Sequence, residues 1–121
     1  MVKQSYVPDR GHVVWLNFSP QSGHEQKGKR PALVLSPASY NAKVGLAICC
    51  PITRTSKKYP FEVGIPSGLK IEGVVLSDHV KSLDWKSRPA SFVAKVPEQT
   101  YAEVLGKLKW LLEAQGQPAP L

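Results

Sequence analysis

The sequence is poor in cysteine, and its two cysteines are badly placed to brace a fold against each other. Cys49 and Cys50 are adjacent, whereas an unstrained disulfide needs two well-separated and suitably directed positions. Both end the apolar run at residues 46–50, which has the character of a buried strand whose successive side chains point to opposite faces. The run therefore predicts two small buried thiols in a protein of a reducing compartment.

Long apolar segments are also absent. No run approaches the roughly 20 apolar residues with which a helix crosses a bilayer. The segment from Met1 to Tyr6 is too polar for a signal peptide. These two absences predict a soluble, cytoplasmic protein.

Acidic residues are scarce relative to basic ones. The chain has 9 acidic and 16 basic side chains, which give a formal charge of +7. Such an excess favours polyanionic partners, either nucleic acid or an acidic protein segment, and does not separate the two.

Metal-ligand spacing is lacking as well. No pair of histidines, cysteines or carboxylates is spaced as in known metal motifs. We therefore expect no metal and no cofactor. Of the three histidines, His12 and His79 are expected to be structural or solvent-facing, while His24 lies in a loop considered below.

What is present is a series of short apolar runs between turn residues, followed by one helical pattern. The runs predict strands at residues 12–18, 32–35, 46–52, 61–65, 74–77, 80–85 and 90–96, with one helical turn at residues 38–43. After Pro97, apolar side chains recur at three- and four-residue steps, which predicts an amphipathic helix of about 15–18 residues. The recurring side chains are Tyr101, Val104, Leu105, Leu108, Leu111 and Leu112.

This pattern defines one fold class. At 121 residues the chain is long enough for one domain, residues 1–121, with residues 116–121 as a flexible tail. Several short strands and one closing helix predict a mainly β fold, a small and strongly bent barrel with the C-terminal helix packed on it.

Two basic loops are the best candidates for a site. The first, residues 20–29, ends at Arg30, and Pro31 favours an extended backbone at Arg30. The second, residues 53–58, contains Thr53, Arg54, Lys57 and Lys58. Both follow or precede predicted strands, so pairing of these strands can bring the two loops together.

Several motifs of the chain resemble those of the MazF/PemK toxins, small ribonucleases of bacterial toxin–antitoxin systems. They span residues 6–85, and the longest covers residues 23–36. The matching motifs are Tyr6-Val7-Pro8-Asp9-x-Gly11, Trp15-x-x-Phe18-x-Pro20, Gly23-x-Glu25-Gln26-x-Gly28-x-Arg30-Pro31-Ala32-x-Val34-Leu35-Ser36, Pro51-x-Thr53, Tyr59-Pro60-Phe61-Glu62-Val63 and Asp78-x-Val80-Lys81-Ser82.

The resemblance implies an SH3-like barrel of the type shared by CcdB and PemK toxins. It implies a homodimer whose basic groove spans the two subunits. It also implies an acidic antitoxin of the MazE/PemI type whose flexible tail fills that groove. It also implies that the residues at Arg30 and Thr53 act in phosphodiester cleavage, assisted by Glu25.

The chemistry is reasonable for these side chains. RNA carries its own nucleophile, the ribose 2′-hydroxyl, so cleavage leaves a 2′,3′-cyclic phosphate and a 5′-hydroxyl. The planar guanidinium of Arg30 suits the charged transition state and is a poor base. Thr53 then hydrogen-bonds the phosphate and Glu25 is the better candidate base, with His24 a further possible participant. Without the resemblance, Thr53 as a strand cap and Glu25 as a solvated partner of Arg30 would be preferred.

Binding is expected to extend beyond the reacting phosphate. Trp85 lies among basic residues, where it either stacks on an unpaired base or belongs to the core. Asn17 stands where the family commonly has Asp, which points to a different preferred RNA sequence. The predicted RNA-binding residues are Asn17, Ser19, His24, Lys29, Arg54, Lys57, Lys58, Lys81 and Trp85.

The leading interpretation is a toxin that cleaves single-stranded mRNA at preferred sequences without a metal, and thereby inhibits translation and growth. One alternative is a non-catalytic CcdB-like toxin that binds DNA gyrase, against which the set Glu25, Arg30 and Thr53 argues. Another is a basic barrel that binds RNA without cutting it. Fold alone does not decide among them.

Overall fold

The computed structural model describes residues 6–17 and 29–116, and in these ranges the chain forms seven strands and two helices. Every strand pairing among them is antiparallel. In chain order the elements are β1 (His12–Asn17), β2 (Lys29–Val34), α1 (Ala38–Val44), β3 (Leu46–Thr53), β4 (Glu62–Gly64), β5 (Val74–Leu76), β6 (Lys81–Asp84), β7 (Ser91–Lys95) and α2 (Glu98–Glu113).

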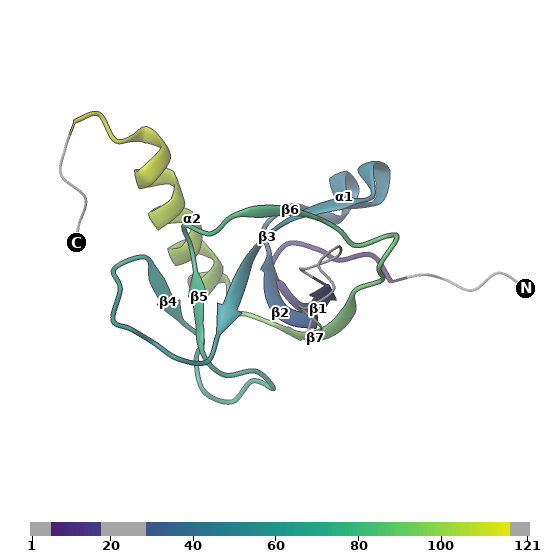
Figure 1. Cartoon of the computed structure of the whole chain (residues 1–121), viewed down its shortest axis with the longest axis horizontal. Coiled ribbons are helices and arrows are strands. Elements are labelled where there is room, and N and C mark those ends of the chain that lie inside the picture. Colours follow the sequence, from purple (N-terminus) through teal and green to yellow (C-terminus); the bar gives the residue numbers. More distant parts are fainter. Residues whose placement is uncertain (1–5, 18–28, 117–121) are drawn as a thin grey trace, which may run out of the picture.

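One strongly curled sheet organises the molecule (Figure 1). Its strand order is β4-β5-β3-β2-β1-β7, and β6 also pairs with β3. Strand β3 is therefore central, with β2 along one edge and with β6 and β5 along successive parts of the other. The predicted mainly β fold with a C-terminal helix is confirmed. Within the described ranges, however, no pairing joins β4 to β7, so the sheet is curled and open rather than a closed barrel.

The predicted strands are all found, with shifted ends. The largest shift is in β2, which begins at Lys29 and not at Ala32, so Arg30 lies inside the strand. Its polar start pairs with the end of β1, Leu16 opposite Arg30 and Asn17 opposite Lys29. Hydrogen bonding to β1 therefore makes β2 begin before its apolar run, which starts at Ala32.

The sheet has an apolar cluster on each side. Strand β1 contributes to both, because Val13 belongs to one cluster and Val14 and Leu16 to the other. All three side chains are fully buried, and the register of β1 against β7 shifts between Val13 and Val14. The predicted alternation of the cysteines is confirmed, since Cys50 lies in the first cluster and Cys49 in the second.

Helix α2 has the predicted position and length, with 16 residues after Pro97. Its first turns pack on the sheet, where Val104 is fully buried and the hydroxyl of Tyr101 donates to the carbonyl of Leu35 at 2.7 Å. The far end extends past the sheet (Figure 1), and Leu112 is 75% exposed. The apolar stripe predicted from the sequence is thus buried only in its first half. No helix in the described part of the chain is long and apolar enough to cross a membrane.

A buried polar network ties α1 to the sheet. The Asn41 side chain is fully buried, and its Nδ2 donates to the carbonyls of Pro8 at 2.8 Å and Ser36 at 3.0 Å. Its Oδ1 accepts a bond of 2.6 Å from the Ser36 hydroxyl, and its carbonyl accepts the indole N–H of Trp85 at 3.1 Å. The network fixes the turn that connects β2 to β3, the two strands that carry the candidate site.

Candidate active site

Strands β2 and β3 bring the two predicted loops to one edge of the sheet. Their register pairs Ala32 with Pro51 and Leu33 with Cys50. Continued by two residues, it sets Arg30 opposite Thr53, the last residue of β3. Arg30 is exposed there, so a guanidinium and a hydroxyl line the same accessible strand end.

Two hollows adjoin this pair, and both are lined by Arg30, Ile52 and Thr53. The first, called here the Lys57 hollow, has a volume of about 890 Å³. Its other lining residues are Pro51, Thr55, Lys57, Tyr59, Glu62, Leu76, His79 and Lys81. The second, called here the Trp15 hollow, has about 620 Å³. Its other lining residues are Trp15, Pro31, Arg54, Leu69, Lys70, Ile71 and Glu72.

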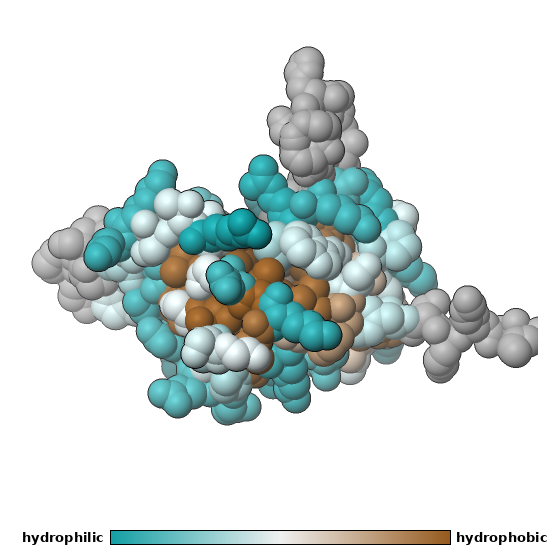
Figure 2. Space-filling model, turned by 90° about the horizontal axis from the view of Figure 1, so that it is seen from below, coloured by the Kyte–Doolittle hydropathy of each residue, from teal (hydrophilic) through white to brown (hydrophobic). Residues whose placement is uncertain are grey.

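Cations predominate over acids around the shared wall. The Lys57 hollow combines Arg30, Lys57 and Lys81 with the single carboxylate Glu62. Seen from below, the molecule presents an apolar area with hydrophilic side chains around and across it (Figure 2). A surface of this mixed kind can hold apolar base faces and charged phosphates together.

Glu62 orders the loop that carries Lys57. Its carboxylate accepts the hydroxyl of Ser56 at 2.6 Å and the backbone N–H of Lys57 at 2.9 Å. These bonds, first that of Ser56 and then that of the Lys57 N–H, lower the pKa of Glu62. The hydroxyl of Ser56 also accepts the N–H of Lys58, whose φ is 58°. The sequence does not indicate this contact of Glu62, because the folding of the loop against it leaves no trace in a local pattern.

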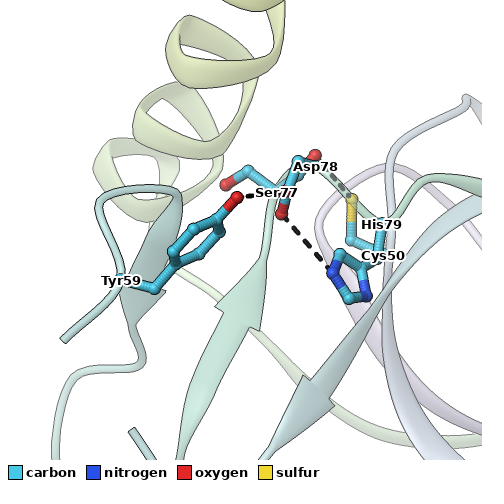
Figure 3. Close-up of polar contacts among 5 residues, drawn as sticks. All are labelled: Cys50, Tyr59, Ser77, Asp78 and His79. Carbon is cyan, nitrogen blue, oxygen red and sulfur yellow. Dashed lines mark hydrogen bonds and ion pairs between the residues drawn. The ribbon is translucent and has the colours of Figure 1, made fainter. Parts of the chain in front are cut away.

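A second polar group borders the Lys57 hollow, at residues that the sequence analysis did not select. Figure 3 shows the Tyr59 phenol and the His79 imidazole on either side of Asp78. The Tyr59 hydroxyl donates to Asp78 Oδ2 at 2.9 Å, and this bond raises the pKa of Tyr59. His79 Nε2 lies 3.8 Å from Asp78 Oδ1, which is buried and has no hydrogen-bond partner among the described residues. A histidine and a tyrosine thus line the same hollow as Arg30. Tyr59 and Asp78 stand in two of the matched motifs, but no local pattern indicates that they contact each other.

Gly73 fits closely against Thr53. Its φ is 128°, and a Cβ atom at this position would lie 2.2 Å from the Thr53 carbonyl oxygen. The connection between β4 and β5 can therefore approach the end of β3 only because this residue has no side chain.

The remaining predicted site residues fall into three groups. Ser19, His24 and Glu25 lie outside the residues that the structure describes. Lys81 lines the Lys57 hollow and Arg54 the Trp15 hollow, while Lys29 and Asn17 form the β1–β2 pair next to Arg30. Lys58 is exposed but lines neither hollow.

Trp85 does not fit its predicted place in the site. It is 6% exposed, packs in the cluster of Val14 and Leu16, and donates its indole N–H to Asn41. An aromatic ring held in this way offers no free face to a base, so Trp85 is left out of the RNA-binding set. Its position among basic residues suggested otherwise because Trp85 follows β6 in a turn, where tertiary contacts set the direction of its side chain.

Groups of three or more histidine, cysteine or acidic side chains suited to a metal ion are not found in the described residues. The two thiols are not activated, since burial raises the pKa of Cys49 and of Cys50 to about 12. Among the described residues, the polar side chains around the two hollows are guanidinium, hydroxyl, imidazole and ammonium groups and the carboxylates of Glu62 and Glu72.

A small curled antiparallel sheet with one C-terminal helix, and with a guanidinium at the joint of two basic hollows, defines a class of basic β proteins suited to bind phosphates. The sequence model of the family described as "PemK-like, MazF-like toxin of type II toxin-antitoxin system" matches residues 9–112. The chain belongs to this family, and the predicted membership is confirmed.

Individual relatives support the membership of this family. The chain is 45% identical over 107 residues to the endoribonuclease toxin MazF of Escherichia coli K12, covering 88% of this chain and 96% of the relative. It is 32% identical over 116 residues to the endoribonuclease PemK of Escherichia coli, covering 93% and 87%.

Solved structures show the same fold. The crystal structure of MazF from Deinococcus radiodurans is 60% identical, with a TM-score of 0.81 over 89% of this chain and 98% of that chain. A MazE–MazF crystal structure from the same organism is 58% identical, with a TM-score of 0.85 over 92% and 100%. The MazF-like fold is thus established.

Proposed function

We propose that this protein is the toxin of a type II toxin–antitoxin system and an endoribonuclease that cleaves single-stranded mRNA at preferred sequences without a metal. The observation that supports the proposal is that Arg30 and Thr53 both line each of two adjoining basic hollows. The relatives named MazF and PemK are endoribonucleases, which favours cleavage over binding of gyrase or passive RNA binding.

The reaction needs little from the protein beyond placing and neutralising charge. The 2′-hydroxyl attacks the adjacent phosphorus, and the bond to the 5′-oxygen of the next nucleotide breaks. Arg30 binds two phosphate oxygens with its planar fork and stabilises the charge that builds up in the transition state. Thr53 donates a hydrogen bond to the same phosphate, and Glu25 takes the proton from the 2′-hydroxyl. The leaving 5′-oxygen takes up a proton from Arg30 or from water and becomes the 5′-hydroxyl. Arrest of translation and growth follows from loss of mRNA.

Lysine and arginine side chains hold the flanking backbone. The proposed binding residues in the described ranges are Asn17, Lys29, Arg54, Lys57, Lys58 and Lys81, and Ser19 and His24 complete the set from the sequence. The cytoplasm, where mRNA is translated, is the proposed location.

An acidic antitoxin is the proposed partner, and a homodimer the proposed assembly. The net charge of +7 suits a flexible acidic tail that wraps the basic surface and orders on binding. Because tail and RNA are attracted by the same cations, they exclude each other. The MazE–MazF structures of Deinococcus radiodurans support a partner of this kind.

Incubation of end-labelled RNA with the protein in EDTA tests the activity. We expect cleavage with a 2′,3′-cyclic phosphate on the upstream fragment and a 5′-hydroxyl on the downstream one. A substrate with a single deoxyribose 5′ of the scissile phosphate is the control, and it should not be cut there. Cutting of that substrate at the same bond would make water the nucleophile and refute the mechanism, while intact RNA throughout would refute the activity.

A further inference from the structure

Trp15 is the exposed residue of β1, whose other residues are buried or partly buried. Its neighbours Val13, Val14 and Leu16 have no exposed surface, whereas Trp15 is 39% exposed. Such a large apolar surface is costly to leave in water, since burial of a large aromatic side chain contributes up to about 3 kcal/mol. The exposed indole of Trp15 therefore indicates that a ligand covers it or that another function requires its exposure.

The surroundings of Trp15 point to a ligand with both apolar and anionic parts. Trp15 pairs directly with Pro31, the residue next to Arg30. Together with Ile52, Leu69 and Ile71, Trp15 and Pro31 supply the apolar lining of the Trp15 hollow. The cationic lining comes from Arg30, Arg54 and Lys70, with Glu72 as the one carboxylate.

The other two tryptophans lie elsewhere. Trp85 is buried in the core, and Trp110 borders a groove between α2 and the segment before β4, with Phe61 and Lys107. Trp15 is the tryptophan that shares a hollow with both Arg30 and Thr53. An aromatic ring beside a phosphate-binding guanidinium matches a nucleotide, whose base stacks while its phosphate is bound.

We propose that the Trp15 hollow is a base-binding subsite, in which the indole of Trp15 stacks on the unpaired base next to the scissile phosphate. The inference deepens the proposed function and rests on it. With the phosphate at Arg30 and Thr53, the base on one side enters the Trp15 hollow and the strand continues through the Lys57 hollow on the other. Arg54 and Lys70 bind the backbone phosphate beyond the stacked base.

The test pairs changes in the protein with changes in the substrate. Two RNAs carry one abasic nucleotide, immediately 5′ or immediately 3′ of the scissile phosphate. With the unchanged protein, one of them should lose roughly 5- to 150-fold in kcat/KM, the range expected for one stacked base. With Trp15→Ala the intact RNA should lose about as much, and the same abasic substitution should then cost nothing further. Independent, multiplicative losses would overturn the proposal, and so would indifference of the unchanged protein to both abasic RNAs.

Two further variants separate stacking from packing. Trp15→Phe keeps a stacking ring and should retain discrimination against the abasic RNA, whereas Trp15→Leu keeps apolar volume only and should lose it. Equal behaviour of the two variants would overturn the proposal. Trp110→Ala is the matched control, a tryptophan at a hollow without Arg30, and should keep the full discrimination.

A binding readout is independent of cleavage. An oligonucleotide with deoxyribose at the cleavage position, bound to Trp110→Phe, should quench the fluorescence of Trp15, because buried Trp85 contributes a constant background. The abasic version should quench several-fold less, and equal quenching by both would overturn the subsite. Failure of the proposed function gives a different result from failure of the subsite. If the protein is not an endoribonuclease, it cuts no RNA, while the fluorescence of Trp15 still reports whether a base is bound.

Discussion

Glu62 holds the backbone of Lys57 through a 2.9 Å hydrogen bond, in which the Lys57 N–H donates to carboxylate Oε2. With the bond from Ser56 to the other oxygen, it makes one strand-end carboxylate the anchor of a cationic loop. The placement of Lys57 in its hollow thus depends on an acid that is itself outside any proposed reaction step.

Removal of this anchor should weaken binding more than chemistry. Glu62→Ala should raise KM several-fold and leave kcat within about two-fold, because Arg30 and Thr53 stay on their strands. Steady-state cleavage of one RNA measures the split, with Glu113→Ala at the end of α2 as a control for removal of one acidic charge. A fall in kcat with KM unchanged would contradict the assigned part of Glu62.

The hydrogen bonds that Glu62 accepts from the Lys57 loop should depend on pH. The pKa of Glu62 is lowered below its ordinary value of 4.5, so the loop bonds are intact above that pH and are lost as the pH falls through the lower, folded-state value. The amide resonance of Lys57 should therefore shift in acid with an apparent pKa below 4.5. A midpoint above that value would mean that these hydrogen bonds do not stabilise the carboxylate.

Replacement of Arg30 should abolish most of the activity. Loss of a positioned charge donor costs on the order of 10²–10³ in rate, and Arg30→Lys should fail nearly as badly as Arg30→Ala because an ammonium lacks the planar fork. Both variants should unfold at the same temperature as the unchanged protein, since the side chain is exposed. Arg10→Lys, over the ring of Tyr101, is the control. Near-normal cleavage by Arg30→Lys would show that charge alone suffices.

Lys57 and Lys58 should contribute to RNA and antitoxin binding alike. The double change to Gln should flatten the salt dependence of RNA binding by about 0.7 in log–log slope for each phosphate that is no longer neutralised. It should also weaken binding of an acidic antitoxin peptide. The pair Lys43 and Lys109, changed to Gln, removes the same charge from the two helices and should leave both ligands bound. A stable ternary complex of toxin, peptide and uncleaved RNA would contradict the shared surface.

Gly73→Ala should displace the end of β3 that carries Thr53. The new methyl group would lie 2.2 Å from the Thr53 carbonyl oxygen at a backbone φ of 128°, so the strand end must move. We expect a loss of stability of about 1–3 kcal/mol and reduced cleavage. Gly106→Ala is the matched control, because it has open space in a helix and should stabilise by about 0.4–1 kcal/mol. Unchanged cleavage by Gly73→Ala would show that the backbone position of Thr53 is unimportant.

Asn41 should be the costliest polar residue to replace. Asn41→Ala leaves the carbonyls of Pro8 and Ser36 without a donor and the Ser36 hydroxyl without its acceptor. Each buried group left unpaired costs about 1–3 kcal/mol, so denaturant unfolding should show a loss of at least about 2 kcal/mol. Gln99→Ala is the control, because it removes an exposed carboxamide from α2 and should change stability by less than about 0.5 kcal/mol. Equal stability of the two variants would contradict the network.

The elements were predictable where one chemical pattern covers a whole element. The repeat from Tyr101 to Leu112 fixes α2, and Pro97 fixes where it begins. The alternation around Cys49 and Cys50 follows from strand geometry alone. The strand β2 shows the limit, since its polar start at Lys29 and Arg30 is extended only because β1 lies beside it.

The site was predictable only in part. Arg30 and Thr53 came from the family resemblance, and their meeting depends on the register between two strands. Trp15 and Trp85 show why the rest was not. Trp15 lines a hollow from β1, whose register against β7 shifts between Val13 and Val14. Trp85 follows β6 and faces the core, where its indole N–H donates to Asn41. Local sequence does not record either.

The wall shared by the two hollows also bears on what happens after the bond is broken. An RNA strand laid across Arg30 and Thr53 is held on both sides, and each contact raises the effective concentration of the other. After cleavage each fragment keeps only one of the two hollows and no longer has that avidity. For the proposed site we therefore expect intact RNA to displace its own fragments, with weak product inhibition as the result.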